Sequence, residues 1–226
     1  MAESMRQEFL NDVKKTDDKA ILFFAGYGQD PTPFVDLAKE IPVFMVYDYD
    51  EDLSFNQDKL KQFSEIKLIA WSIGVMMAGI VLENCSLNSR IVKSIAVNGT
   101  CDGIAIDEDE IGLKAQLWLN TAQNLDENGR LNFIENMLLN KGNEHYRANL
   151  PKRDCASLKQ ELYALLKLKQ EHMYFKRYEF SEAIIAKRDK IFPPSCVRAC
   201  FSHIAYKSGP WAHYDDKLFS ELFLNF

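Results

Sequence analysis

The most constraining feature of this 226-residue chain is the stretch at residues 65–83, EIKLIAWSIGVMMAGIVLE. Its apolar run at 66–71 is long enough for one buried strand, and residues 75–82 read as a helix. Ser72 and Gly74 stand between the two. A strand, a sharp turn that holds a serine, and a closely packed helix make up a nucleophile elbow, so Ser72 is a candidate nucleophile.

The residues around Ser72 bear on this interpretation. The serine backbone of an elbow is strained, so the residues two before and two after it must be small. Here they are Ala70 and Gly74, which gives A-x-S-x-G where the usual motif is G-x-S-x-G. A plain strand–turn–helix with a surface serine remains an alternative, because a motif of this kind is a hypothesis until its context is known.

Strand-like runs recur along the chain with helical segments between them. Residues 19–24, 42–47 and 91–97 are apolar runs bounded by turn residues, and the pattern returns at 183–186. The alternation predicts an α/β fold with a mainly parallel central sheet and helices on both faces. Residues 1–18 are expected to form a short helix or a loose end.

The pattern changes between residues 113 and 183. Four helices are expected there, at 113–120, 130–140, 157–171 and 174–183, without clear strands. We therefore predict a hydrolase-like core at 1–112 and 184–226 and a helical lid insertion at 113–183. Residues 113–190 hold 14 Lys and Arg against 10 Asp and Glu, whereas the rest of the chain holds 13 against 23.

Composition excludes several classes of protein. The net charge of −6 argues against general nucleic-acid binding. No apolar run reaches the ~18 residues that span a bilayer, and the first residues lack the apolar core of a signal peptide, so no membrane association and a cytoplasmic location are expected. The five cysteines form no C-x-x-C pair, and no metal site or other cofactor is expected.

A serine nucleophile needs a base and an acid. Of the four histidines, His213 stands in a loop before the last expected helix (216–223), where a hydrolase carries its base. Asp189, just after the strand at 183–186, is the favoured acid, and Asp107, after the strand at 91–97, is the alternative. The backbone N–H groups of Ile73 and Tyr27 are the candidates for an oxyanion hole.

Four short motifs together resemble the BioG esterases of biotin synthesis: FFAGYG at 23–28, WSIG at 71–74, VNGT at 97–100 and AHY at 212–214. The resemblance implies an α/β-hydrolase fold, with Ser72 as nucleophile and His213 as base. It also places Tyr27 at the oxyanion hole, and Trp71 and Gly26 against the substrate. The acidic stretch at 107–110 and the pair Asp215–Asp216 depart from the family pattern.

The resemblance also implies a reaction and a partner. The reaction is hydrolysis of pimeloyl-acyl carrier protein methyl ester without a cofactor, and the partner is an acidic acyl carrier protein. The densest basic run of the insertion is the candidate docking surface: Arg147, Lys152, Arg153 and Lys159. The same run can equally be a solvated helix face. The alternatives for the whole chain are a general carboxylesterase or thioesterase for small acyl groups, and a non-catalytic binding module with a hydrolase-like fold.

Overall fold

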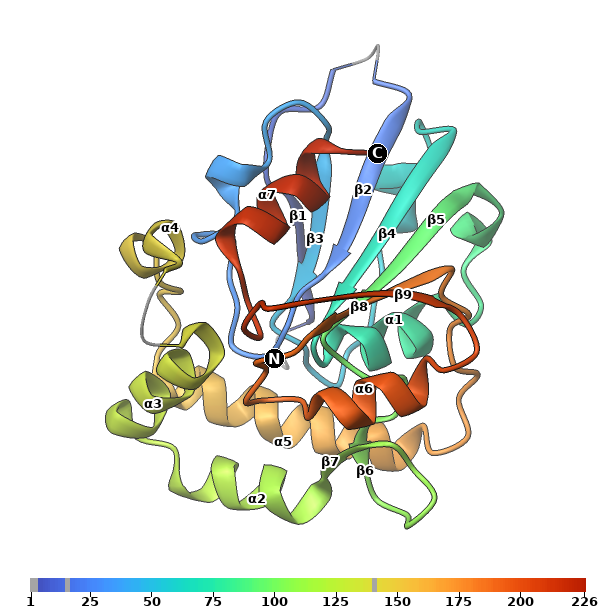
Figure 1. Ribbon diagram of the computed structural model, residues 1–226. Coiled ribbons are helices and arrows are strands. Elements are labelled where there is room, and N and C mark those ends of the chain that lie inside the picture. Colours follow the sequence, from blue (N-terminus) through green and yellow to red (C-terminus); the bar gives the residue numbers. More distant parts are fainter. Residues whose placement is uncertain (1–3, 15–16, 140–141) are drawn as a thin grey trace.

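The protein is built on one seven-stranded sheet, seen in a computed structural model that describes residues 4–14, 17–139 and 142–226 (Figure 1). The strand order is β1-β3-β2-β4-β5-β8-β9. Its strands are β1 (Arg6–Phe9), β2 (Lys19–Phe24), β3 (Val43–Tyr47), β4 (Glu65–Trp71), β5 (Ile91–Val97), β8 (Glu182–Ala186) and β9 (Ala205–Gly209). Every neighbouring pair is parallel except β1 with β3. The prediction of a mainly parallel α/β sheet is therefore confirmed.

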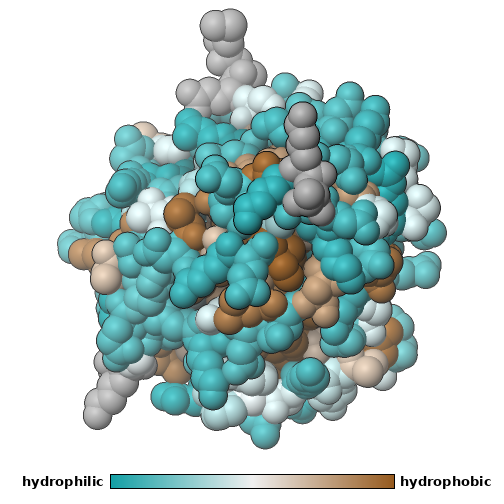
Figure 2. Space-filling model, turned by 90° about the horizontal axis from the view of Figure 1, so that it is seen from above, coloured by the Kyte–Doolittle hydropathy of each residue, from teal (hydrophilic) through white to brown (hydrophobic). Residues whose placement is uncertain are grey.

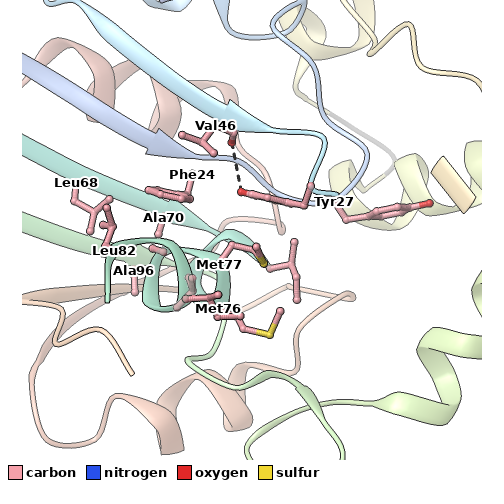
Figure 3. Packing of buried hydrophobic residues seen from close by; sticks show 14 of the residues in the cluster. Phe24, Tyr27, Val46, Leu68, Ala70, Met76, Met77, Leu82 and Ala96 are labelled. Atoms are coloured by element: carbon pink, nitrogen blue, oxygen red, sulfur yellow. Dashed lines mark hydrogen bonds between the residues drawn. The ribbon is translucent and has the colours of Figure 1, made fainter. Parts of the chain in front are cut away.

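The inner strands are apolar on both faces, because parallel strands are covered on both sides. In β2, Leu22 and Phe24 belong to one core, and Ile21 and Phe23 belong to the other. The first core contains side chains of α1 (Gly74–Leu82) and α6 (Pro194–Cys200), and Figure 3 shows Met76 and Met77 of α1 among them. The second contains side chains of α7 (Asp216–Leu224).

Several short connections are 3₁₀ helices: η1 (Val35–Leu37), η2 (Gln57–Leu60) and η3 (Ser86–Arg90). The expectation of a short helix or a loose end at residues 1–18 is wrong for Arg6–Phe9, which forms strand β1, while residues 1–3, 15 and 16 lie outside the described residues. Strand β1 lies antiparallel to β3, with Gln7 opposite Val46, and its burial alternates between exposed and half-buried. Its polar residues suit an edge strand and weaken the apolar signal by which a strand is recognised.

The helical segment begins with a second, two-stranded sheet of β6 (Gly103–Ala105) and β7 (Gly112–Lys114). The helices are α2 (Ala115–Asn124), α3 (Glu127–Leu138), α4 (Glu144–Ala148) and α5 (Cys155–Glu171). In Figure 1, α2, α3 and α5 gather at the end of the sheet toward which β2 and β4 point. In hydrolases that end of the sheet carries the active site.

The helix expected at 174–183 is absent from the described structure. Residues 174–181 form no helix, and β8 begins at Glu182. Here Ser181 donates through its backbone N–H and its hydroxyl to Ser94 O, at 3.1 Å and 2.8 Å. Phe175 lies against α1, since a Cβ on Gly79 would stand 2.9 Å from its ring. These tertiary contacts outweigh local helix propensity.

The end of the molecule that lies opposite α2, α3 and α5 presents mostly hydrophilic residues, with apolar residues between them (Figure 2). Within the described residues, no helix combines the length and the apolar character that crossing a bilayer requires.

Candidate active site

Ser72 occupies a strained turn between β4 and α1. Its φ of 60° lies in the left-handed region, which costs free energy for a residue with a side chain. The backbone N–H of Ser72 donates to Val97 O at 2.9 Å, which ties the turn to the end of β5. Ser72 is buried, so its hydroxyl is held inside the molecule. Strain of this kind, kept in place by its surroundings, is typical of a functional position.

Two glycines allow the chain to close around this turn. A Cβ on Gly74 would stand 2.4 Å from Phe24 O, and one on Gly99 would stand 2.0 Å from Ser72 O. Both contacts are with backbone atoms that cannot give way. Ala70, by contrast, is buried in the core between β2 and β5, where its methyl group is accommodated. This explains why the motif here tolerates alanine before the serine and requires glycine after it.

Ser72, His213 and Asp189 form one buried hydrogen-bonded chain. The Ser72 Oγ to His213 Nε2 distance is 2.9 Å, and the His213 Nδ1 to Asp189 Oδ2 distance is 2.7 Å. The second carboxylate oxygen of Asp189 accepts from the backbone N–H groups of Ile191 and Phe192, at 2.7 Å and 2.9 Å. Three loops that follow β4, β8 and β9 thus bring together the three residues that the sequence placed in this order.

The alternative acid, Asp107, lies elsewhere. It is exposed, in a turn where its backbone N–H donates to Glu110 Oε2 at 3.1 Å. Glu110 in turn pairs with Lys169 of α5. The structure therefore places Asp189, and not Asp107, against His213.

The backbone of His213 is held by two side chains from neighbouring strand ends. Its carbonyl oxygen accepts from Trp71 Nε1 at 3.0 Å and from Asn98 Nδ2 at 2.8 Å. Asn98 also accepts from the backbone N–H of Ala186 through Oδ1, at 2.8 Å, and it adopts a φ of 48°. Asn98 was not predicted as a site residue, although a turn signal, Asn-Gly at the end of a strand, marks its position.

Trp71 and Gly26, the two residues expected to contact the substrate, pack behind the Ser72 turn. Trp71 is buried in the core on the α7 side of the sheet, away from the cavity beside Ser72. Gly26 lies against Ser72, since a Cβ on it would stand 3.1 Å from Ser72 Cβ. Neither residue lines the cavity beside the serine.

An apolar cavity of about 150 Å³ adjoins Ser72. Its walls come from the core and from the helical segment, and they include Tyr27, Leu117, Trp118, Phe133, Leu162 and Phe192. Lys190, next to Asp189, contributes a charged side chain. An acyl chain is the kind of group that such walls bind, because burying its methylenes removes apolar surface from water.

The loop after β2, residues 25–29, which we call the Tyr27 loop, borders the same cavity. Among the residues that the structure describes, the amide N–H groups of Tyr27 and Ile73 have no hydrogen-bond acceptor. The Tyr27 ring points away from the sheet (Figure 3) and meets the rings of Trp118 and Phe133 edge-on, with centroids 5.9 Å and 5.5 Å away. Burial, with the nearby charge of Glu161, raises the pKa of the Tyr27 phenol well above its ordinary value.

The basic run of the insertion divides into inward and outward members. The Arg153 side chain is only 6% exposed and pairs with Glu161 and Asp48, so its charge is compensated inside the protein. Arg147 pairs with Glu135. Lys152 is exposed and Lys159 is half-buried. In the described part of the chain, no cluster of three or more His, Cys, Asp or Glu side chains is arranged to hold a metal ion.

Comparison with solved structures places this architecture in the α/β-hydrolase fold. An esterase from Exiguobacterium antarcticum superposes with a TM-score of 0.68 at 12% identity, covering 97% of this chain and 94% of the other. A lipase-esterase related protein from Clostridium acetobutylicum gives a TM-score of 0.63 at 16% identity, covering 99% and 100%. At these identities the likeness shows the fold alone.

The sequence identifies a family within this broad fold. Residues 5–214 match the family described as Pimeloyl-ACP methyl esterase BioG, and the chain belongs to it. The crystal structure of selenomethionine BioG from Haemophilus influenzae superposes with a TM-score of 0.80 at 29% identity, covering 96% of this chain and 97% of that one.

Two curated relatives match in sequence. An uncharacterized protein of Haemophilus influenzae (strain ATCC 51907 / DSM 11121 / KW20 / Rd) is 34% identical over 177 residues, which are 77% of this chain and 78% of the relative. A malonyl-[acyl-carrier protein] O-methyltransferase of Bacteroides fragilis (strain 638R) is 31% identical over 208 residues. The match covers 90% of this chain but only 41% of that protein.

Proposed function

We propose that this protein is a serine esterase that cleaves the methyl ester of pimeloyl-acyl carrier protein in biotin biosynthesis. The observation that carries the proposal is the buried chain from Asp189 through His213 to Ser72 at the edge of an apolar cavity. Membership of the BioG family supports the choice of substrate. The Bacteroides relative is named for an acyl-carrier-protein substrate, which agrees with a carrier-linked ester.

The geometry suits acyl transfer through a covalent intermediate. Ser72 Oγ attacks the ester carbonyl carbon while His213 Nε2 accepts the hydroxyl proton. Asp189 holds the N–H at His213 Nδ1 and stabilises the imidazolium that forms. The amides of Ile73 and Tyr27 donate to the oxyanion of the tetrahedral intermediate.

Collapse of that intermediate breaks the bond from the carbonyl carbon to the methoxy oxygen. His213 returns its proton to the departing oxygen, and methanol leaves. Water then attacks the acyl-enzyme carbonyl and gives a proton to His213, which passes it to Ser72 Oγ as the bond to the acyl group breaks. The carboxylic acid departs and loses its proton to solvent.

The division of the chain follows from this placement. We propose that residues 1–112 and 184–226 form the catalytic core and that residues 113–183 form a lid, since α2, α3 and α5 supply walls of the cavity beside Ser72. The acyl chain would lie along these walls with its methyl ester at the serine. The carrier protein would then remain outside, in contact with the insertion.

The docking of that carrier is assigned to the outward basic residues. Lys152, Lys159 and Arg147 are proposed to meet the acidic carrier by electrostatic steering. Arg153 is no longer a candidate, because its guanidinium is buried against two carboxylates. The cytoplasmic location stays a prediction of the sequence.

Methanol release from pimeloyl-acyl carrier protein methyl ester tests the proposal. We expect turnover of this substrate with a higher kcat/KM than for dimethyl pimelate or a short p-nitrophenyl ester. Similar values for all three would indicate a general carboxylesterase, and preferential cleavage of the carrier thioester would indicate a thioesterase. An absence of serine labelling by a fluorophosphonate, together with no ester hydrolysis, would indicate a non-catalytic module.

A further inference from the structure

A carboxylate of the helical insertion reaches the Tyr27 loop. Glu161, in α5, is 1% exposed, and its Oε2 accepts from the backbone N–H of Gly28 at 3.0 Å. Its Oε1 accepts from the N–H of Tyr49 at 3.4 Å. The contact joins positions 133 residues apart in the sequence, the core loop after β2 and the middle of a helix in the insertion.

The charge of this carboxylate is compensated in place. Arg153 donates to Glu161 Oε2, and the same guanidinium pairs with Asp48. A buried carboxylate is costly unless it is paired and hydrogen-bonded, and here both conditions hold. The carboxylate is therefore held in place inside the protein, and it contacts the candidate active site directly at Gly28 of the Tyr27 loop.

The peptide between Tyr27 and Gly28 is held at both ends. Its N–H donates to Glu161, and its carbonyl oxygen accepts from Gln29 Nε2 at 3.2 Å. Gln29 is itself fixed, because its Oε1 accepts from Tyr146 Oη at 2.7 Å. The amide of Tyr27, the candidate oxyanion donor, belongs to the preceding peptide and is separated from the held one by a single Cα.

The loop needs such a restraint. Tyr27 stands between two glycines, and Gly28 has a φ of 75°, so the backbone has more freedom than in other turns. Leu158 of α5 also contacts the loop, since a Cβ on Gly28 would stand 3.2 Å from its Cδ2. Helix α5 therefore holds the loop in two ways: Leu158 packs against it, and the hydrogen bond from Gly28 to Glu161 orients its backbone.

We propose that Glu161 is a positioning residue for the oxyanion hole: its carboxylate fixes the Tyr27–Gly28 peptide and so keeps the Tyr27 amide aimed at the Ser72 site. The proposal rests on the proposed function, since it needs Ser72 as the nucleophile. It means that the insertion supplies orientation to the reacting centre as well as walls to the cavity. Because an oxyanion donor acts in the transition state, Glu161 should affect kcat and leave KM nearly unchanged.

Three substitutions separate this role from simple stabilisation. Glu161→Gln keeps an oxygen that accepts from Gly28 but loses the charge opposite Arg153. Glu161→Asp keeps the charge but is one methylene shorter and withdraws from Gly28. Glu161→Ala removes both, and Glu171→Gln is a matched control on the exposed end of the same helix.

On a short p-nitrophenyl ester, Glu161→Ala should lower kcat roughly 10- to 100-fold and leave KM within about twofold of wild type. This loss is smaller than the roughly 10²–10³-fold loss that follows when an oxyanion-hole donor is itself removed. Glu161→Asp should lower it about tenfold, whereas Glu161→Gln and Glu171→Gln should stay within about threefold of wild type. The affinity for an alkylboronic acid, which forms a tetrahedral adduct on the serine, should fall in parallel with kcat. The affinity for a non-reactive alkane-chain competitor should stay the same.

Several results would overturn the proposal. They are an unchanged kcat in a folded Glu161→Ala protein, a loss confined to KM, and a larger loss for Gln than for Asp, which would assign the effect to the charge. If the alanine variant does not fold, the comparison of Gln with Asp decides the same question. Failure of the proposed function looks different, because wild-type enzyme would then show no activity that Ser72→Ala abolishes.

Discussion

The Ser72 turn and the Tyr27 loop lie at the ends of adjacent strands, β4 and β2, and yet they are held in different ways. The Ser72 turn is held by close packing in the core, where Gly74 and Gly99 lie against backbone atoms. The Tyr27 loop contains two glycines and is held by Glu161 of the insertion. The core thus fixes the position of Ser72, the proposed nucleophile, whereas the loop with the proposed oxyanion donor is also held by helix α5.

This difference has a physical basis. A strained φ such as that of Ser72 persists only where many neighbours fix it, and the centre of a sheet supplies them. The Tyr27 loop is also largely buried, but Tyr27 stands between two glycines, so the orientation of its backbone depends on hydrogen bonds to Gly28 and Tyr27. Changes in the core residues of the site should therefore abolish activity, whereas changes in the insertion should adjust it.

The largest effect is expected from Ser72→Ala. Its kcat on a short p-nitrophenyl ester should fall roughly 10⁴- to 10⁶-fold, because members of a triad act as a unit. Circular dichroism and the melting temperature should show an intact fold. Activity above a few per cent of wild type would mean that another residue is the nucleophile.

Asp189→Asn should come next, with kcat lower by roughly 10⁴-fold, since an amide would favour the wrong tautomer of His213. The matched control is Asp107→Asn, in the exposed turn after β6, which should stay within about twofold because surface changes seldom matter. Rates measured across pH 6–9 would separate a tautomer effect from a shifted optimum. The opposite ranking of the two variants would contradict the hydrogen-bonded chain as the catalytic unit.

A smaller effect is expected from the outward charges of the insertion. Reversing Lys152 and Lys159 to Glu should raise KM for the carrier-linked methyl ester by about three- to tenfold and flatten its dependence on salt. Hydrolysis of a small carrier-free ester should not change. Equal losses on both substrates would show damage to the lid, and no loss on either would leave these lysines as solvated surface.

The smallest effect concerns stability and pH. Burial raises the pKa of Glu161 from 4.5 to about 6, against the opposing effect of Arg153. The folded protein then binds this proton more tightly than the unfolded chain, so the proton stabilises the fold below pH 4.5 and this contribution is lost as the pH rises through 6.

Urea unfolding of wild type and Glu161→Gln between pH 4 and 7 measures this contribution, because glutamine does not titrate. As the pH rises from 4 to 7, the unfolding free energy of wild type should fall by about 2 kcal/mol relative to that of Glu161→Gln. A difference that stays constant with pH would mean that Arg153 and the backbone donors fully compensate the buried charge.

Much of this protein could be predicted from local patterns. The strands at 19–24, 42–47 and 91–97 are apolar runs, and such runs are recognisable because a central parallel strand must be apolar on both faces. The Ser72 turn carries its own signature, since the steric need for glycine at position 74 is met within a few residues of sequence. The choice of His213 and Asp189 followed from the order of elements, which a sequence also displays.

Other features were decided by contacts between distant segments. Residues 174–183 read as a helix until their contacts with Ser94 and α1 are known, and Arg153 reads as a surface cation until Asp48 and Glu161 surround it. Asn98 meets the backbone of His213 across 115 residues of sequence, and Glu161 meets Gly28 across 133, so local sequence could not indicate either contact. A sequence shows the chemistry that each residue can perform, but burial and orientation depend on neighbours that only the folded chain brings together.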